Sequence, residues 1–391
     1  MKLGKLSLVA VMALGTSAFA IENTKVAGEA KVIYQTTERG AQDLFDYDTN
    51  SLAGIGLRVG ATTDLVKGFS AGVEAQAFTT LGLENNLVKG VMATDSTDDQ
   101  WQFSQIWIAT TMGNTTAKLG RMELDTPLAF TEKWNVVNNT FDAAVVLNND
   151  LPDTTLVAAW VGKDNGMGGD GLLISSNGKT ADMNSNFGTF MASGAYAVAA
   201  INKSLPGTTL QGWYYNVLDV ADAFWLQADS KVAMVNVGAQ YANMNPKADG
   251  LETSSIWAVK ASADVSGVNV YAAYSSADND GVLGFANTAT GDKTKIYTGL
   301  GSIYMDGIVT RPGADTYKVG ASTTAAGIKL AASYTDSDAD AGNEISAWDV
   351  SASGALGPVG LQAIYTSVSN DSALYSGMDL DTLRIIASLK F

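Results

Sequence analysis

Apolar residues alternate with small or polar residues in many short runs along the chain. In residues 26–34, 53–61 and 69–77, every second residue is apolar or glycine. The same period recurs in residues 235–241, 257–265, 268–274, 317–321, 328–334, 348–352 and 359–365. A period of two is typical of β-strands that bury one face, so the pattern predicts an all-β fold.

The segments between these runs are of two kinds. Short ones are tight turns built on Gly, Asn, Asp or Pro: TTDLVKG, MGNTT, NDLPDTT, KSLPGTT, ADSK, VSG, AAG and LGP. Longer polar ones cover residues 36–51, 80–99, 123–140, 163–187, 217–222, 243–253, 275–314, 336–345 and 369–381. Eight turns and nine longer segments make seventeen connections, which predicts eighteen strands.

An even number of strands, joined by short turns at one end and longer loops at the other, is typical of barrels that cross the outer membrane. A soluble β-sandwich also alternates, but its connections need not sort by length. A parallel β-helix requires a short fixed repeat that this sequence lacks. We therefore predict an all-β transmembrane antiparallel β-barrel of about 18 strands, with an inward-folded constriction loop.

The first twenty residues have the features of a signal peptide. Lys2 and Lys5 precede an apolar run, and Ala18 and Ala20 form a small-residue cleavage site. The alternative is an N-terminal core helix. We expect residues 1–20 to be a signal peptide and residues 21–391 to form the barrel. The expected location is the outer membrane of a Gram-negative cell, reached through the periplasm.

The composition excludes several kinds of chemistry. The chain has no cysteine and no histidine, so disulfides, thiolate catalysis and histidine-based catalysis or zinc sites are ruled out. We expect no enzyme. Acidic residues outnumber basic ones by 40 to 24, a balance that attracts cations and disfavours nucleic acid.

Aromatic residues concentrate where the predicted strands meet the longer segments, as the girdle of a membrane barrel requires. Ordinary core aromatics at strand ends are the alternative. The group is Tyr34, Phe78, Trp101, Phe103, Tyr241, Trp257, Tyr274, Tyr317, Tyr334, Trp348 and Tyr365.

The residues of opposite parity would face a water-filled lumen. They include charges of both signs, and each such charge would cost roughly 2–4 kcal/mol on the lipid face near the midplane. The predicted pore-lining residues are Glu29, Lys31, Arg58, Glu74 and Arg384. Trp107 and Arg121 break the alternation of their strands, which predicts a bulge near Gly120.

The segment MELDTPLAFTEKWNVVNNTF combines carboxylates with apolar side chains that could pack on the barrel wall. We expect it to fold inward and narrow the lumen; a solvent-facing loop is the alternative. Its predicted functional residues are Arg121, Glu123, Asp125, Thr126, Pro127, Glu132 and Lys133.

The stretch KLGRMELDTPLAF, followed by NTFDA, resembles the OprD-type porins, and the general pattern is similar to the major outer-membrane porins of Campylobacter. The resemblance implies an eighteen-stranded, usually trimeric diffusion channel, with Gly120, Arg121, Leu124, Thr126, Pro127 and Leu128 at the wall and start of the constriction loop. Substrate-specific members have a ladder of lumenal arginines. This chain has five arginines in all, which favours a general, cation-preferring porin.

The segment DSDADAGNE places carboxylates at alternate positions, a spacing that suits the oxygen ligands of calcium. The candidate ligands are Asp336, Asp338, Asp340, Asn343 and Glu344. The spacing differs from that of an EF-hand, and a solvated acidic loop is the alternative. No other cofactor is expected.

Two functions fit the pattern. The first is a porin for passive diffusion of small hydrophilic solutes and ions, expected to be a homotrimer in outer-membrane lipid. The second is a barrel scaffold whose long surface loops, chiefly 275–314, serve adhesion or interaction. The final strand, LRIIASLKF, should close the barrel against residues 26–34. Its Phe391 resembles the signal by which the barrel assembly machinery recognises its clients.

Overall fold

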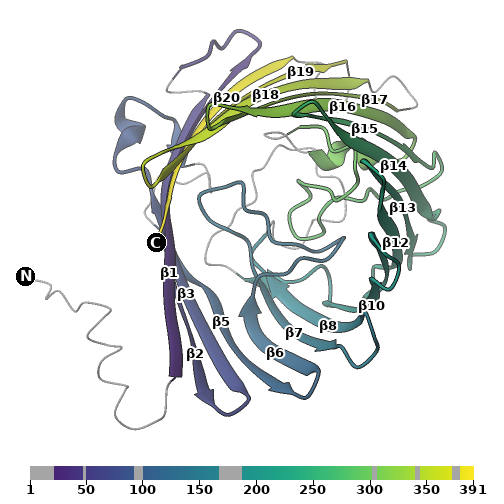
Figure 1. Ribbon diagram of the computed structural model, residues 1–391. Coiled ribbons are helices and arrows are strands. Elements are labelled where there is room, and N and C mark those ends of the chain that lie inside the picture. The colour runs from purple at the N-terminus through teal and green to yellow at the C-terminus, as the bar shows by residue number, and fades with distance from the viewer. Residues whose placement is uncertain are drawn as a thin grey trace, which may run out of the picture.

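The computed structural model describes residues 22–46, 50–91, 100–166, 187–301, 306–339, 344–371 and 379–391. The predicted signal peptide, residues 1–20, lies outside these ranges. Twenty strands occur in this part of the chain, of which β4 (Gly90–Val91) and β9 (Gly188–Thr189) have two residues each. The other eighteen make the wall of a barrel (Figure 1).

The first half of the wall consists of β1 (Glu22–Arg39), β2 (Ser51–Val66), β3 (Phe69–Thr79), β5 (Gln100–Met112), β6 (Thr115–Met122), β7 (Phe141–Asn148), β8 (Thr154–Asp164), β10 (Ala195–Asn202) and β11 (Thr208–Val217). The second half consists of β12 (Ala221–Val232), β13 (Val235–Pro246), β14 (Ser254–Val265), β15 (Val268–Ala277), β16 (Ala314–Ala325), β17 (Ile328–Ala339), β18 (Ile345–Leu356), β19 (Val359–Asn370) and β20 (Leu380–Lys390).

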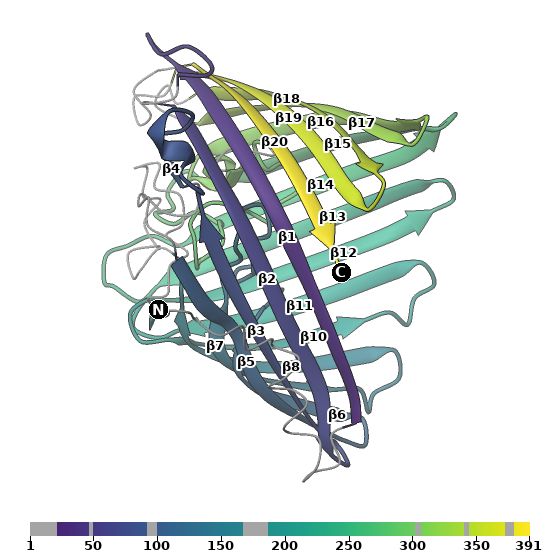
Figure 2. The same ribbon diagram turned by 90° about the vertical axis from the view of Figure 1, so that its left-hand side faces the viewer.

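The sheet closes on itself. Each wall strand pairs antiparallel with the next, and β1 pairs with both β2 and β20. At this seam Gln35 lies opposite Arg384, both with side chains toward the lumen. The strands are tilted and β1 extends beyond the end of β20 (Figure 2). The predicted eighteen-stranded antiparallel barrel is confirmed.

Most connections sort by length as the sequence predicts; the exception is the predicted longer segment 217–222, where only three residues, 218–220, join β11 to β12. Short turns join the strands at one end, and one of them lies at Ala233–Met234, beginning two residues after the end of the expected ADSK segment, 228–231. The long connections at the other end contain β4, β9 and two short 3-10 helices, η1 (Leu83–Asn85) and η2 (Asp306–Thr310). In the part of the chain that the structure describes, no helix is long and apolar enough to cross a bilayer.

Aromatic side chains circle much of the outer face near the loop end. Neighbouring rings from successive strands touch, as in Trp257–Tyr274 and Tyr334–Trp348. Phe78 is an exception to the sequence prediction, because it has the parity of the inner face and is buried against the constriction loop. The girdle prediction was wrong for this residue.

β6, which contains Gly120, pairs without a register shift, and the bulges of this region lie in β5 and, opposite Asp142 and Ala143, in β8. The register between β3 and β5 shifts between Glu74 and Ala75, so that Ser104 has no partner on β3. The extra residue reverses the parity of β5: Trp101 and Phe103 face outward before it, and Ile106 and Ile108 after it. Trp107 therefore faces the lumen, where the Lys118 ammonium lies 4.0 Å from its ring centre.

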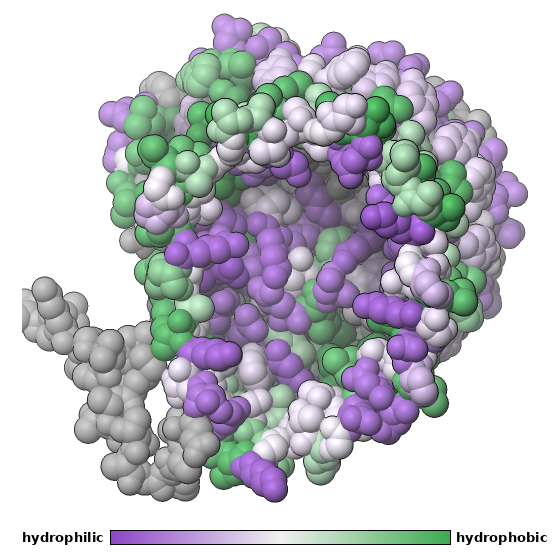
Figure 3. Space-filling view, viewed as in Figure 1, coloured by the Kyte–Doolittle hydropathy of each residue, from purple (hydrophilic) through white to green (hydrophobic). Residues whose placement is uncertain are grey.

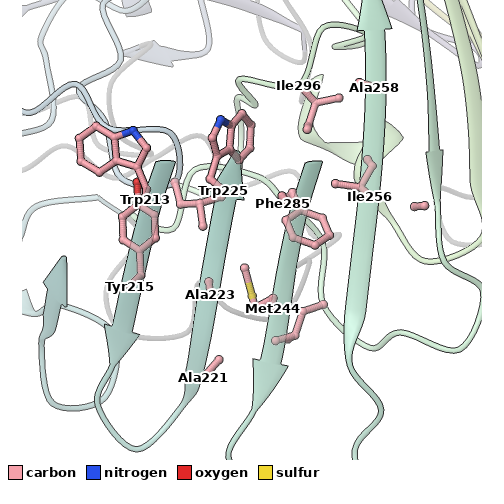
Figure 4. Close-up of a cluster of buried hydrophobic side chains, with 14 of the residues drawn as sticks. Trp213, Tyr215, Ala221, Ala223, Trp225, Met244, Ile256, Ala258, Phe285 and Ile296 are labelled. Carbon is pink, nitrogen blue, oxygen red and sulfur yellow. The ribbon is translucent and has the colours of Figure 1, made fainter. Parts of the chain in front are cut away.

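One sector of the inner wall is apolar. The inward residues of β7 to β14 are mostly apolar, and they pack with apolar residues of two loops that enter the lumen (Figure 4). Trp213 and Trp225 come from the wall, and Leu128, Phe285 and Ile296 from the loops. Because burial of such side chains stabilises the folded state by about 1.5–3 kcal/mol each, this sector anchors the loops.

The end of β20 is fixed against β1. The Phe391 and Gly28 main chains exchange two hydrogen bonds, of 2.8 and 3.1 Å. A Cβ added at Gly28 would lie 2.4 Å from an atom of the Phe391 ring, so the ring covers the glycine on the outer face. Glycine at this position leaves room for the aromatic ring at the seam.

We therefore expect Gly28→Val to displace the Phe391 ring and weaken closure by about 1–3 kcal/mol, as overpacking does. The midpoint of urea unfolding should fall, whereas Ala30→Val, also outward on β1, should leave it within experimental error. Equal effects of the two variants would show that the ring contact has no special role.

A comparison of Gly28→Val with deletion of Phe391 separates the packing role of the ring from its role as an assembly signal. If Phe391 is an assembly signal, deleting it should impair membrane insertion in cells far more than Gly28→Val does. Equal insertion defects in the two variants would contradict the signal prediction.

Candidate functional site

The constriction loop, residues 123–140, connects β6 to β7 and crosses the lumen. At one side Leu128 is buried in the apolar cluster of β11 to β14. At the other side Val136 and Val137 pack with Ile33 and Phe78 of the β1–β3 wall. The loop thus contacts two separate sectors of the barrel, which a solvent-facing loop would not do.

Two glycines of β2, Gly54 and Gly56, form the surface on which the constriction loop packs. Added Cβ atoms would lie 3.0 Å from a methyl carbon of Val136 at Gly54 and 2.5 Å from the Val136 oxygen at Gly56. Any larger side chain at Gly56 would push the loop off the wall. The inward residues of β2 are therefore glycines where the loop crosses the strand. The next inward residue of β2, Arg58, is charged.

A tight turn forms the part of the loop next to the apolar wall. Thr126 accepts the Ala129 amide hydrogen at 3.1 Å and donates its hydroxyl to the Ala129 oxygen at 2.8 Å. Pro127 is buried in this turn. The Leu124 amide donates to the Thr131 hydroxyl oxygen at 3.1 Å and closes the base. The Thr-Pro pair seen in the sequence thus shapes the turn.

A second long segment, residues 278–313, also enters the lumen; we call it the inner loop and describe its residues 278–301 and 306–313. Thr288 binds the Leu128 oxygen through both its amide (2.8 Å) and its hydroxyl (2.7 Å). Leu283 and Phe285 join the apolar cluster. We expected this segment to be a surface loop, but its described residues pack inside the barrel because their apolar side chains cover the apolar inner wall.

Glu132 joins the two loops. Its carboxylate accepts hydrogen bonds from the Asn287 amide at 2.8 Å, the Thr290 hydroxyl and the Trp134 ring nitrogen at 2.7 Å. Glu132 itself is 3% exposed. Asn287 also accepts the Phe130 amide hydrogen at 3.1 Å and donates to the Phe130 oxygen at 2.8 Å. Glu132 therefore holds the constriction loop to residues 287–290, and its carboxylate is buried between them and does not face the open part of the lumen.

Arg58 lies at the centre of the predicted pore-lining charges. Its guanidinium is 2.9 Å from Glu29, 3.4 Å from Glu123 and 3.8 Å from Glu74. These residues come from β1, β2, β3 and the constriction loop. Strand pairing thus brings three carboxylates, far apart in the sequence, around one cation.

Two lysines complete this group. Lys31 donates to the main-chain oxygens of Lys133 at 3.1 Å and Asn135 at 3.0 Å, and so ties the loop to β1. The Lys133 ammonium lies 2.6 Å from Glu123 and is well exposed. We call Glu29, Lys31, Arg58, Glu74, Glu123 and Lys133 the constriction charges; they comprise three charges of each sign.

The surroundings of Glu123 keep it ionised. Partial burial acts to raise its pKa, but hydrogen bonds from Lys133 and Asn138 and the charges of Lys133 and Arg58 outweigh burial. The pKa of Glu123 is therefore held below its ordinary value of 4.5. Glu123 remains an anion at neutral and mildly acidic pH.

A second polar group lies across the lumen on β12 and β14. Asp229 accepts the Tyr297 hydroxyl hydrogen at 3.0 Å and pairs with Lys260 at 2.7 Å. Burial and the Asp229 carboxylate raise the pKa of Tyr297, so its hydroxyl stays protonated and donates. Nearby, the exposed Asp125 carboxylate pairs with Lys295. These contacts hold the inner loop to the wall opposite the constriction charges.

Arg384 is inward and 2% exposed. It donates two hydrogen bonds to the Gln35 side-chain oxygen, at 2.8 and 2.6 Å, and its guanidinium lies 5.0 Å from the centre of the Trp134 ring. Arg384 therefore supports the constriction loop from the seam. It faces inward as predicted, but it is covered and does not border the open path.

Arg121 requires a correction. It lies in β6 and faces outward, between outward Leu119 and inward Met122 along the strand. Its guanidinium binds both oxygens of Asp142, at 2.8 and 3.2 Å, and donates to the Phe103 oxygen at 3.0 Å. The sequence prediction assigned Arg121 to the constriction loop, although its parity with apolar Leu119 places it on the outer face of β6.

The candidate calcium ligands are only partly described. Asp336 and Asp338 lie in β17, on the outer face, where Tyr334 donates to Asp336 at 2.8 Å. Asp340 and Asn343 are outside the described residues, and Glu344 is described. No group of three or more acidic residues that could hold a metal ion occurs in the described ranges. Calcium binding at this connection stays a prediction.

Together these features define a class of protein: a closed barrel whose lumen is narrowed by two loops that fold inward. Figure 3 shows the hollow at the centre of the molecule, bordered largely by hydrophilic side chains. No protein-family model and no curated protein matches the chain. In contrast, solved structures with the same architecture match the chain over nearly its whole length.

OccAB1 of Acinetobacter baumannii is 12% identical, covers 96% of this chain and 99% of its own, and gives a TM-score of 0.77. OccK9 (OpdG) of Pseudomonas aeruginosa is 14% identical; the match covers 95% of this chain and 99% of OccK9, with a TM-score of 0.74. The outer membrane protein opdK of P. aeruginosa is 13% identical; the match covers 94% of this chain and 99% of opdK, with a TM-score of 0.70. At these identities the likeness concerns the fold, and at that level it agrees with the resemblance to OprD-type porins.

Glu132 offers a test of how the loops are held. Glu132→Ala leaves the Asn287, Thr290 and Trp134 donors without their acceptor, at a cost of about 1–3 kcal/mol for each buried group left unpaired. We expect the loops to loosen, so that single-channel conductance rises and becomes noisier. Glu252→Ala, in the β13–β14 connection, is the matched control. Unchanged conductance in Glu132→Ala would show that the loops are held by apolar packing alone.

The low pKa of Glu123 predicts a pH profile. Because a carboxylate with a lowered pKa keeps its charge to lower pH than an ordinary glutamate does, ion selectivity set by Glu123 should begin to change only at a pH lower than an unperturbed glutamate would give. Lys133→Met removes the main cause of the lowered pKa, so the change in reversal potential should begin at higher pH. Lys203→Met, in a short turn, should leave the profile unchanged, and a profile unaffected by Lys133→Met would contradict this account.

Proposed function

We propose that the chain is an outer-membrane porin that passes small hydrophilic solutes and ions by passive diffusion. The observation that supports this proposal most directly is a polar lumen narrowed by the constriction charges. Barrels of 16–18 strands are wide enough to hold a water-filled channel. An enzymatic function is less well supported than a channel, because carboxylates of the lumen such as Glu29 and Asp229 are already paired with Arg or Lys side chains of the barrel wall.

The ion preference we propose is a weak one for cations. The whole chain has a formal net charge of −16, whereas the constriction charges balance. Acidic residues lie instead on the outer face and in the connections at the loop end, such as Asp222, Asp315 and Asp381. Their field would raise the cation concentration at the mouth, and it would be screened by salt over about 10 Å at 0.1 M.

An adhesion scaffold remains the second candidate. Segment 275–314 was the chief candidate for adhesion in the sequence analysis. Its described residues pack against the constriction loop inside the barrel, which argues against an adhesive role for them. Other long connections, such as 163–187 and 369–381, lie partly outside the described residues. We therefore favour the channel.

The channel is tested in planar bilayers. Purified protein should give ohmic conductance steps and a reversal potential of cation sign across a salt gradient. Glu123→Gln combined with Asp125→Asn should move that potential toward zero or to anion sign, because Lys133 and Lys295 then lose their counter-charges and Arg58 loses one of its three. Asp249→Asn, in the β13–β14 connection, should change it much less.

Absence of conductance from protein with normal barrel spectra would contradict the porin proposal. Conductance with a reversal potential that ignores both charge changes would leave the channel standing and assign its selectivity to the acidic residues at the mouth alone.

A further inference from the structure

A small cavity lies between the apolar inner wall and the two loops that enter the lumen. Its volume is about 60 Å³, and it is largely enclosed. One side is formed by β8 and β10 to β13, and the other by the constriction loop, the inner loop and η2. A space of about 10–15 Å³ holds one water and an apolar cavity of about 150 Å³ holds benzene, so this cavity suits a molecule smaller than benzene.

Alanine residues of the barrel wall leave this space open. Ala159, Ala197 and Ala223 lie in one row across β8, β10 and β12, because strand pairing places them at the same height. Tyr215 of β11 lies in the row between Ala197 and Ala223. Figure 4 shows the small side chain of Ala223 between Tyr215 and Met244 of the neighbouring strands. We call the space in front of this row the alanine cavity.

The next row of the wall, nearer the short turns, is filled. There Trp213 lies opposite Trp225, and both side chains are buried. The ring of Trp213 stacks on that of Tyr215, with the ring centres 5.9 Å apart and the planes within 11° of parallel. The stacking fixes the Tyr215 ring at the edge of the alanine cavity.

The loops also present small residues to the alanine cavity. Ala129 of the constriction loop and Ala286 of the inner loop both line it. A Cβ atom added at Gly307 of η2 would lie 2.6 Å from the Ala286 Cβ atom, so glycine lets η2 pack directly on the inner loop. Protein interiors normally fill their space with interdigitating side chains. Here small residues on both sides preserve a space.

One polar side chain at the alanine cavity lacks a hydrogen bond. Tyr215 is 5% exposed, and its hydroxyl oxygen has no hydrogen-bond partner in the described part of the chain. Thr126 and the Leu128 main chain lie beside it, outside hydrogen-bonding geometry. Because burial of an unpaired hydroxyl is unfavourable, a group of this kind in a native structure indicates a partner that the chain itself does not supply.

Water alone fits the alanine cavity poorly. A buried water needs two to four polar partners. The two threonine hydroxyls that line the cavity are already engaged, that of Thr126 with Ala129 and that of Thr288 with the Leu128 oxygen. Of the lining side chains, only the Tyr215 hydroxyl is open. A molecule with one hydroxyl group and a short alkyl group satisfies both the hydroxyl and the apolar surface.

We propose that the alanine cavity binds a short-chain aliphatic alcohol. The alcohol oxygen accepts the Tyr215 hydroxyl hydrogen, and the alkyl group packs on Ala197 and Ala223. Because the bound molecule touches the wall and both loops, it holds the constriction loop and the inner loop to the barrel. None of the constriction charges lines the alanine cavity, so this site is separate from the polar path.

The test uses the full barrel in detergent and 2-fluoroethanol as the probe. Its ¹⁹F line should broaden on binding, saturate with concentration, and sharpen again when propan-1-ol displaces it. Tyr215→Phe keeps the ring and removes only the hydroxyl, so binding should weaken roughly three- to tenfold, the contribution of one hydrogen bond. Ala223→Leu fills the space and should abolish saturable binding. Ala239→Leu, outward on β13, is the matched control and should bind as the wild type does.

Xenon separates the volume of the alanine cavity from its hydroxyl. The ¹²⁹Xe shift that the wild type produces should persist in Tyr215→Phe and be lost in Ala223→Leu. If the leucine displaces the loops, as altered heat-dependent gel mobility would show, the smaller Ala223→Val should still weaken binding of both probes.

Three results would overturn the proposal. They are no saturable binding by the wild type, as a cavity that holds only water would give; equal affinity in Tyr215→Phe; and binding that survives Ala223→Leu, as partition into detergent would give. Binding is measured without conductance, so its failure is distinguishable from a failure of the proposed channel.

Discussion

Closure of the sheet between β1 and β20 is the constraint on which the rest of the structure depends. It gives the backbone groups of β20 partners on both sides, and it gives every wall strand one outer and one inner face. The alternation of side chains follows from this division. The position of Phe391 over Gly28 fixes the register at the seam, and through it the inward positions of Gln35 and Arg384.

The constriction is built by packing first and by charge second. Apolar residues of β7 to β14 hold the tips of both loops, and the small surface of Gly54 and Gly56 receives Val136. Glu132 then ties the loops together where water is excluded. The constriction charges lie on the opposite side of the same loop, so that the buried face sets its position and the polar face borders the open path.

Much of the wall could be predicted from the sequence, and the details of the site less well. The strand count, the two kinds of connection and the inward loop follow from periodicity and from the Thr-Pro segment. Arg121 was misassigned to the constriction loop although it shares the parity of outward Leu119 on β6. The reversal of parity in β5 could not be predicted, because the unpaired Ser104 is evident only from the pairing of β5 with β3. Phe78 was misassigned to the girdle although its even number places it on the inner parity of β3, a signal that the sequence did contain.

The sequence by itself determined that this chain is a barrel with a polar lumen, because a period of two in ten runs, together with eight short turns and nine longer segments, permits few other ways to bury one face. Only the tertiary structure decided which charges meet and which loops enter. Arg58 contacts carboxylates from three other segments, and the inner loop binds Leu128 and Glu132 some 160 residues away in the chain. Such contacts depend on strand order and loop packing around the whole ring, and no local pattern encodes them.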